Sequence, residues 1–209
     1  MSLSPEQFFA FLAAAMLITV SPGPDNLMVL GVGIARGRAP GVAFGLGCGF
    51  GCLSHTLLAT LGVSALIAAS PLAFALLKVG GGLYLVWLGV QALRSRGGVT
   101  AASAQDADES LRRLFAKGLL ANAINPKVVL FFLSFLPQFV IADHGHVGWQ
   151  TLQLGLSFTA QAALLFALLG YFSGAVGNWL QRHGRAGLWL DRLAGTIFVG
   201  LGVRLIAAR

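Results

Sequence analysis

Six long apolar segments take up most of this 209-residue chain, and they constrain its fold more than any single motif does. A helix that crosses a bilayer needs about 20 mostly apolar residues. The segments run over about Pro5–Ala35, Gly41–Ala69, Pro71–Leu93, Leu114–Ile141, Val147–Leu169 and Leu188–Ala207. Only 10% of the residues are charged, whereas a soluble domain has about 25%. The sequence therefore predicts an all-α integral membrane protein with six transmembrane helices.

The first and fourth segments are each interrupted by proline next to a charge. One interruption reads Ser21-Pro22-Gly23-Pro24-Asp25-Asn26, and the other reads Asn122-Ala123-Ile124-Asn125-Pro126-Lys127. Proline removes a backbone donor and clashes with the preceding helical turn. A charge at the centre of a span costs about 2.5–3.5 kcal/mol. We therefore expect helices one and four to be broken, with the helix breaks made by Pro22, Gly23, Pro24 and Pro126.

One polar stretch divides the chain into two halves of similar organisation. It runs from about residue 94 to 113 and includes Asp106, Asp108 and Glu109. We interpret it as a linker within a single transporter domain over 1–209, between a first repeat over about 1–93 and a second over about 114–209. Three spans per half make the second half enter from the opposite side, so two inverted three-helix repeats are predicted. Matching breaks in such halves predict a binding site between them.

Lys and Arg fall in alternate loops, which sets the orientation. One face should carry nine of them: Arg36, Arg38, Arg94, Arg96, Arg112, Arg113, Lys117, Arg182 and Arg185. That face is predicted to be cytoplasmic, so both termini should lie outside. The net charge of +7 does not indicate nucleic-acid binding, because these residues occupy loops and not one amphipathic face. No cleavable signal peptide is expected, because no cation precedes Arg36.

Asp25 and Lys127 should lie at one depth in the membrane. Asp25 is eleven residues before Arg36, and Lys127 is ten residues after Lys117. At about 1.5 Å per helical residue, each lies about 15 Å from the basic face, half of a 30 Å hydrocarbon core. Two opposite charges near the midplane are predicted to pair across the repeat axis. The alternative is two local kinks whose charged side chains reach the interface separately.

The same segments carry motifs that resemble those of a known family. They are Pro22-Gly23-Pro24, then Lys78-x-x-Gly81-x-x-Tyr84-Leu85-x-x-Leu88-Gly89, then Asn122-x-x-Asn125-Pro126-Lys127 with Phe131-Phe132 and Leu136-Pro137-Gln138-Phe139. In this order they resemble the LysE/RhtB family, the lysine and homoserine/threonine exporters, over nearly the whole chain. The resemblance implies a secondary carrier, not an enzyme, that exports amino acids across the bacterial inner membrane.

An amino-acid zwitterion needs a partner for each of its charges wherever water is excluded. We expect Lys127 to bind the substrate carboxylate and Asp25 its ammonium group, with neutral hydrogen bonds from Asn26, Asn122 and Asn125. Whether Asp25 acts by charge or only as a hydrogen-bond partner stays open. Because the spans offer little acid beyond Asp25, neutral substrates such as threonine, homoserine or leucine are favoured.

The energy source is predicted to be the proton gradient, since the chain has no G-x-x-x-x-G-K-[ST] phosphate loop. Asp25 is one candidate proton carrier and His55 is another, although His55 also fits a hydrogen-bonded packing role. Lys78 would either face the cavity or extend to the outer interface. Gln161 would either contact substrate or tie helices together.

Two other classes of protein compete with the exporter. Cys48, Cys52 and His55 share one segment, so a thiol-redox conduit and a metal-efflux carrier were considered. A redox conduit would want a cysteine near each break, and a metal carrier would want more ligands. No metal site or cofactor is expected. A glycine stripe in the same segment, Gly41, Gly45 and Gly49, fits either internal helix packing or a homodimer interface.

Overall fold

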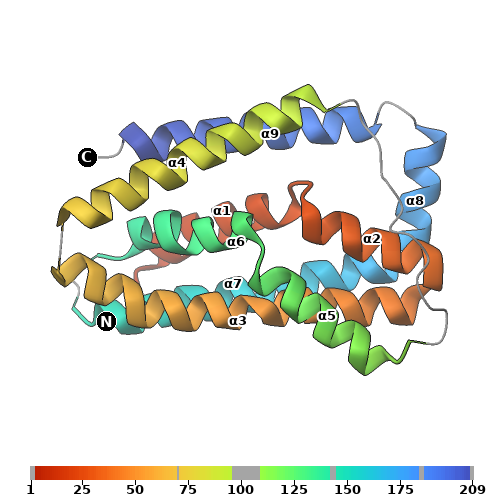
Figure 1. Cartoon of the computed structure of the whole chain (residues 1–209), viewed down its shortest axis with the longest axis horizontal. Helices are drawn as coiled ribbons and strands as arrows, with labels where there is room; N and C mark the ends of the chain where they lie inside the picture. The colour runs from red at the N-terminus through yellow and green to blue at the C-terminus, as the bar shows by residue number, and fades with distance from the viewer. Residues whose placement is uncertain (1–2, 70, 96–108, 142–144, 184–185, 208–209) are drawn as a thin grey trace.

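The computed structural model describes residues 3–69, 71–95, 109–141, 145–183 and 186–207. In these residues every regular element is helical (Figure 1). The elements are α1 (Pro5–Val20), α2 (Pro24–Arg36), α3 (Arg38–Ala69), α4 (Pro71–Arg94), α5 (Leu111–Ala123), α6 (Pro126–Leu130), the π-helical turn η1 (Phe131–Phe135), the 3₁₀ turn η2 (Leu136–Phe139), α7 (Val147–Tyr171), α8 (Ser173–Arg182) and α9 (Ala186–Ala207). The predicted all-α class is confirmed.

Both predicted helix breaks are present. α1 ends at Val20, α2 begins at Pro24, and their axes differ by 54°. α5 ends at Ala123, the helical run resumes at Pro126, and that bend is 49°. Each resumed helix starts with proline, whose missing N–H has no partner to lose in a first turn. The prediction that helices one and four are broken is therefore confirmed.

Short polar residues and one glycine fix the helix ends. Ser4 caps α1 by accepting from the Gln7 amide at 3.2 Å, and the Gln7 side chain accepts from the Ser4 amide in return. Asn125 caps α6 by accepting from the Lys127 amide at 3.0 Å. Gly37 ends α2 with a φ of 92°, a left-handed conformation that favours glycine. These caps determine where the chain turns between passes.

The long helices run along one axis of the molecule and alternate in direction (Figure 1). The chain starts and finishes at the same end, where α3 meets α4 and η2 leads towards α7. α2, α4 and α7 finish at the opposite end, where α3, α5 and α9 begin. α8 lies across this second end. The two helix breaks fall near the middle of the long axis.

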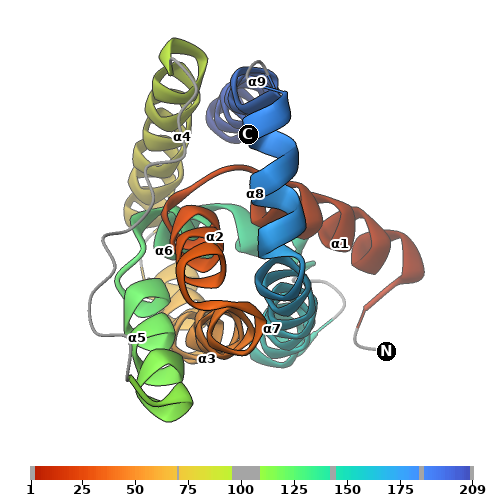
Figure 2. The ribbon, with the colours of Figure 1, turned by 90° about the vertical axis from the view of Figure 1, so that its right-hand side faces the viewer.

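α3 is the centre of the packing, with α5 on one side and α7 on the other (Figure 2). A Cβ atom at Gly45 would clash with the Phe166 carbonyl oxygen, and one at Gly41 would lie 2.8 Å from the Gly170 carbonyl oxygen. The stripe that includes Gly49 thus faces α7 within the same chain. Its internal packing role accounts for these glycines.

α4 and α9 form a separate antiparallel pair beside the other helices (Figures 1 and 2). Close backbone approach holds them together, because a Cβ atom at Gly89 or at Gly195 would lie 2.6 Å from the carbonyl oxygen of the other residue. Phe198 of α9 contacts the second helix break, where its ring centre lies 5.1 Å from Lys127 Nζ.

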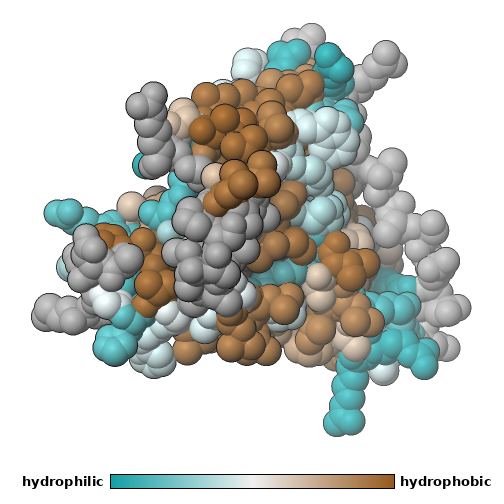
Figure 3. Space-filling view, turned by 60° about the vertical axis from the view of Figure 1, so that its left-hand side comes forward, coloured by the Kyte–Doolittle hydropathy of each residue, from teal (hydrophilic) through white to brown (hydrophobic). Residues whose placement is uncertain are grey.

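Large apolar side chains are exposed along several helices, as Figure 3 shows for one face. They include Leu57 and Leu61 of α3, Leu76 of α4 and Leu164 of α7. Apolar residues that face outwards are expected where lipid is the solvent. By length and apolarity α3 and α7 qualify as membrane spans, and the number rises to four when each bent pair is counted as one. Most of the predicted linker, with Asp106 and Asp108, lies outside the described residues.

Candidate functional site

The two helix breaks border one small cavity. Its lining residues come from both halves of the chain, and the polar ones are Thr19, Asp25, Asn26, Asn122, Asn125 and Lys127. Its apolar lining includes Ile18, Val128, Phe131, Phe158 and Phe166, with Gly23 and Cys52 completing the wall. Five of the lining residues are the five predicted to bind substrate.

Asp25 belongs to the first break and binds a residue of the second. Its side chain is 2% exposed, and its Oδ2 atom accepts from Asn122 Nδ2 at 2.7 Å. Its Oδ1 atom is buried without a hydrogen-bond partner. A buried carboxylate normally fills its acceptor positions. Asp25 also lines the cavity, so this oxygen is a candidate acceptor for a donor bound there.

Lys127 belongs to the second break and binds a residue of the first. Its ammonium group donates to the Ser21 carbonyl oxygen at 2.8 Å and lies 5.1 Å from the centre of the Phe198 ring. An ammonium group has three N–H donors. One donor of Lys127 bonds the second break to the first, which leaves other donors on a residue that lines the cavity. Gly23 leaves room for this side chain, because a Cβ atom there would lie 3.0 Å from Lys127 Nζ.

Asp25 and Lys127 share the cavity without forming a direct ion pair. In the part of the chain that the structure describes, the ion pairs within 4.0 Å all involve Glu109. The predicted pairing of the two charges therefore does not take the form of a direct contact, although both residues line the same cavity. Each charge instead binds a neutral group from the opposite break, Asn122 for Asp25 and Ser21 for Lys127. Because each charge is bonded to a neutral group, both charges can still bind a small molecule in the cavity.

Asn122 connects the site to α3. It is fully buried, its carbonyl oxygen lies 3.0 Å from His55 Nε2, and its Oδ1 atom accepts from the Cys52 thiol at 3.5 Å. Because a carbonyl oxygen only accepts, His55 donates this bond through Nε2. The Asn26 side chain donates to the Thr19 carbonyl oxygen at 2.9 Å and bridges the first break.

The three residues that the sequence left between two roles differ in placement. His55 packs 5.6 Å from the Phe132 ring and lies behind Asn122, outside the set of residues that line the cavity. Gln161 donates to Thr19 Oγ1 at 2.8 Å, which ties α7 to α1. The side chain of Lys78 lies outside the described residues.

Several residues that line the cavity or contact Lys127 were not predicted from the sequence. Ser21 contributes only its carbonyl oxygen, and the signal for it is the pair of prolines that follow, which leave nearby carbonyls without their helical donors. Phe198, Phe158 and Phe166 come from α9 and α7, and their sequence context does not differ from that of other apolar residues. Only the packing of the helices brings their rings to the site.

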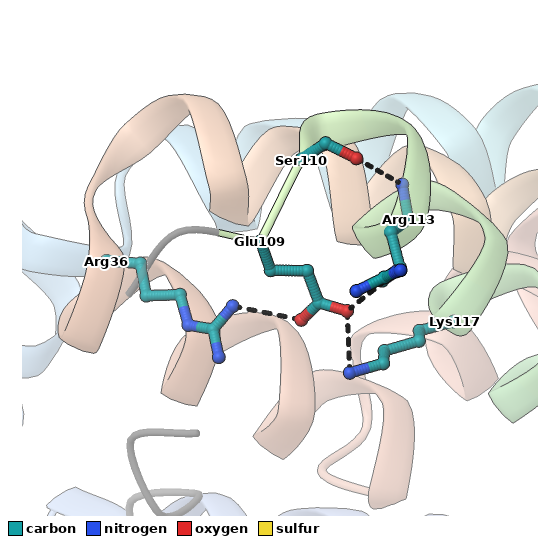
Figure 4. A network of polar contacts seen from close by, with 5 residues as sticks. All are labelled: Arg36, Glu109, Ser110, Arg113 and Lys117. Carbon is teal, nitrogen blue, oxygen red and sulfur yellow. Dashed lines mark hydrogen bonds and ion pairs between the residues drawn. The ribbon is translucent and has the colours of Figure 1, made fainter. Parts of the chain in front are cut away.

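A second polar network lies at the end where α2 finishes and α5 begins (Figure 4). The Glu109 carboxylate accepts from Lys117 at 2.7 Å and from Arg36 at 3.1 Å, with Arg113 at 4.0 Å. The Glu109 side chain is 3% exposed. The hydrogen bonds from Lys117 and Arg36 hold the pKa of the Glu109 carboxyl below its ordinary value. The network joins the basic ends of the two broken helices.

A third, uncharged network joins α1, η2 and α7 at the other end of the molecule. Gln150 is fully buried and accepts from the Gln7 side chain at 3.0 Å. It also donates to the carbonyl oxygens of Ile141 at 2.9 Å and Gly145 at 2.7 Å. Gln7 donates in addition to the Phe139 carbonyl oxygen. Both ends of the broken helices are therefore tied by polar contacts.

Within the described ranges, no group of three His, Cys, Asp or Glu side chains is close enough to hold a metal ion. Cys48 and Cys52 are free thiols, both buried in α3.

The sequence profile of the LysE type translocators matches residues 16–209. The chain belongs to the LysE type translocator family. It is 34% identical to a threonine efflux protein of Escherichia coli, over 95% of this chain and 98% of that protein. It is 32% identical to a leucine efflux protein of Enterobacter, over 95% and 94% of the two chains.

It is 30% identical to a homoserine/homoserine lactone efflux protein of Salmonella typhimurium, over 98% of each chain. No solved structure gives a significant match. Members of this translocator family are transporters and not enzymes, which confirms the resemblance seen in the motifs.

Proposed function

We propose that this LysE-family protein is a secondary carrier that exports neutral amino acids across the bacterial inner membrane, driven by the proton gradient. The observation that carries the proposal is the buried cavity in which a carboxylate oxygen without a partner and a partly satisfied ammonium group come from opposite helix breaks. The names of its relatives, which include threonine and leucine efflux proteins, support an amino acid as the substrate.

The chemistry of the cavity matches an α-amino acid. The substrate ammonium would donate to Asp25 Oδ1, and the substrate carboxylate would accept from the remaining N–H groups of Lys127. Asn26 and Asn125 lie on the same wall and offer neutral hydrogen bonds. Exchanging hydrogen bonds between charged groups lowers the cost of taking a zwitterion out of water. Ile18, Val128 and Phe131 would surround the substrate side chain, which favours an uncharged one.

In the proposed topology six passes form two inverted repeats, with both termini outside the cytoplasm. The alternating direction of the helices supports this arrangement (Figure 1). The basic residues Arg36, Arg38 and Lys117 belong to helix ends that meet at one end of the molecule, which would be cytoplasmic by the positive-inside rule. Protons would be exchanged at Asp25. The second candidate is His55, which is connected to Asp25 through hydrogen bonds to Asn122.

Counterflow in proteoliposomes tests the proposal. Vesicles that contain the purified protein and unlabelled threonine or leucine should accumulate the labelled amino acid, and protein-free vesicles should not. An outward proton gradient imposed across the same vesicles should change the rate if protons are the coupling ion. Failure of every neutral amino acid to show counterflow, with correctly folded protein in the vesicles, would contradict the proposal.

A further inference from the structure

Two further cavities continue from the buried site towards the basic end of the molecule. The second lies against α1, α2, α7 and α8. The third lies between α2, α8 and the start of α9.

Shared lining residues show that the three cavities are neighbours. Thr19, Asn26 and Phe166 line both the central and the second cavity. Val20, Asn26, Leu169 and Val176 line both the second and the third. Asn26, which belongs to the proposed substrate site, lines all three. A continuous series of spaces thus joins the site to the basic end.

Phe166 is the large side chain at the junction of the first two spaces. It is 5% exposed. Phe158 lies eight residues earlier on α7, about 12 Å away along the helix, and lines the central cavity but not the second. The Phe166 ring therefore marks the boundary of the central cavity on the basic side.

The backbone at Phe166 is fixed, so opening depends on its ring. α7 packs so tightly on the α3 glycines that a Cβ atom at Gly45 would clash with the Phe166 carbonyl oxygen. Such contact leaves α7 little room to shift at this point. Rotation of a ring about its side-chain bonds needs no backbone movement.

We propose that substrates reach the buried site from the basic end through these three cavities, and that the ring of Phe166 is the constriction that limits their size. This inference rests on the proposed function for the identity of the substrate. The route and the constriction concern access to the cavity, which is measurable without any substrate.

The two native cysteines provide the access measurement. Cys52 lines the central cavity. Cys48 is equally buried one helical turn earlier, and it is not among the residues that line the cavity. With Cys48→Ala as background, Cys52 is the sole thiol, and Cys52→Ala leaves Cys48 as the matched control. A membrane-impermeant methanethiosulfonate would be applied to inside-out and to right-side-out vesicles.

Phe166→Ala should raise the labelling rate of Cys52 by about tenfold or more in inside-out vesicles, which corresponds to about 1.4 kcal/mol less free energy for access. The rate at Cys48 should stay unchanged. Phe166→Leu, which keeps an apolar side chain, should give an intermediate rate at Cys52. Phe172→Ala removes the same ring from the second cavity only, and it should leave the Cys52 rate near that of the parent.

An unchanged rate at Cys52 in both Phe166 variants overturns the constriction. An equal increase at Cys48 and Cys52 also overturns it, because a general loosening of the helices would explain that result. Faster labelling only in right-side-out vesicles would reject the direction of the route.

Transport then tests the limit on size. Phe166→Ala should raise the counterflow of phenylalanine or tryptophan relative to that of alanine by about tenfold, the scale of discrimination that a pocket wall achieves. An unchanged ratio would overturn the role in selection. A parent protein that moves no amino acid would reject the proposed function and leave the labelling result to decide the constriction.

Discussion

Replacement of Asp25 by asparagine separates the charge of this residue from its hydrogen bonding. Asp25→Asn preserves the shape of the side chain and an oxygen that can still accept from Asn122 Nδ2, now at 2.7 Å from Oδ2. The new amide group takes the place of Oδ1, which is buried and without a partner. A donor would then face the substrate ammonium where an acceptor is needed.

The expected size of the effect follows from that one atom. A hydrogen bond to a charged group contributes about 1.5–3 kcal/mol, so its loss should weaken substrate binding about 10- to 150-fold. Stability should change little, since the bond to Asn122 is kept. Asp25→Ala also leaves the fully buried Asn122 amide without its acceptor, which should cost a further 1–3 kcal/mol of folding free energy, roughly.

Counterflow rates over a range of substrate concentrations give the KM of each variant, and the melting temperature in detergent reports stability. Glu6→Gln makes the same carboxylate-to-amide change at an exposed position in the first turn of α1, and it should match the parent in both measurements. A KM for Asp25→Asn equal to that of the parent would refute the assignment of the substrate ammonium to Asp25.

Three further predictions concern the contacts that hold the helices in place. The hydrogen bonds and ion pairs of Glu109 lower the pKa of its carboxyl. They therefore stabilise the fold at pH values above the ordinary pKa of about 4.5, and this contribution is lost as the pH falls through the lowered pKa. Glu109→Gln should therefore lower the melting temperature at pH 7 and make no difference near pH 3; a difference that persists at pH 3 would contradict this. Gly45→Ala should cost about 1–3 kcal/mol by overpacking α3 against α7, whereas Gly62→Ala, with nothing within 4 Å, should be neutral or slightly stabilising in denaturation; equal losses would contradict the packing argument. Gln150→Leu should leave buried groups of Gln7 and the nearby backbone without partners, at about 1–3 kcal/mol for each group, and an unchanged melting temperature would show that the network contributes nothing.

The sequence predicts the helical class, the two breaks and the charged residues of the site, because each depends on local chemistry. Proline and glycine interrupt helices wherever they occur in them, and a charge in an apolar segment is costly enough to need a partner. What the sequence did not predict is the partner of each charge. Sign and depth predict that Asp25 pairs with Lys127, but they do not predict which neutral groups each charge contacts. The actual partners depend on how the two bent helices cross in close contact. The spacing of apolar residues in the sequence does not predict that geometry.

The aromatic residues of the site lie further from what sequence can show. Phe158, Phe166 and Phe198 are three of 15 phenylalanines in the chain. The positions of Phe158 and Phe166 follow from the α3 glycines, which set how closely α7 approaches α3. A glycine stripe predicts close packing but not the partner helix, so the structure was needed to identify the rings at the cavity.

The positions of the three polar networks suggest how a carrier of this shape would open. Glu109 ties α2 to α5 at the basic end, and Gln150 ties α1, η2 and α7 at the other end. Between these two networks, the hydrogen bonds from Asn122 to Asp25 and from Lys127 to Ser21 join the two helix breaks. Each broken helix is thus held at both ends and at its bend. To admit solute from one side, the protein must separate one terminal network while the other stays closed. The charged network responds to salt and pH, whereas the amide network does not. The two opening steps should therefore differ in their response to solution conditions.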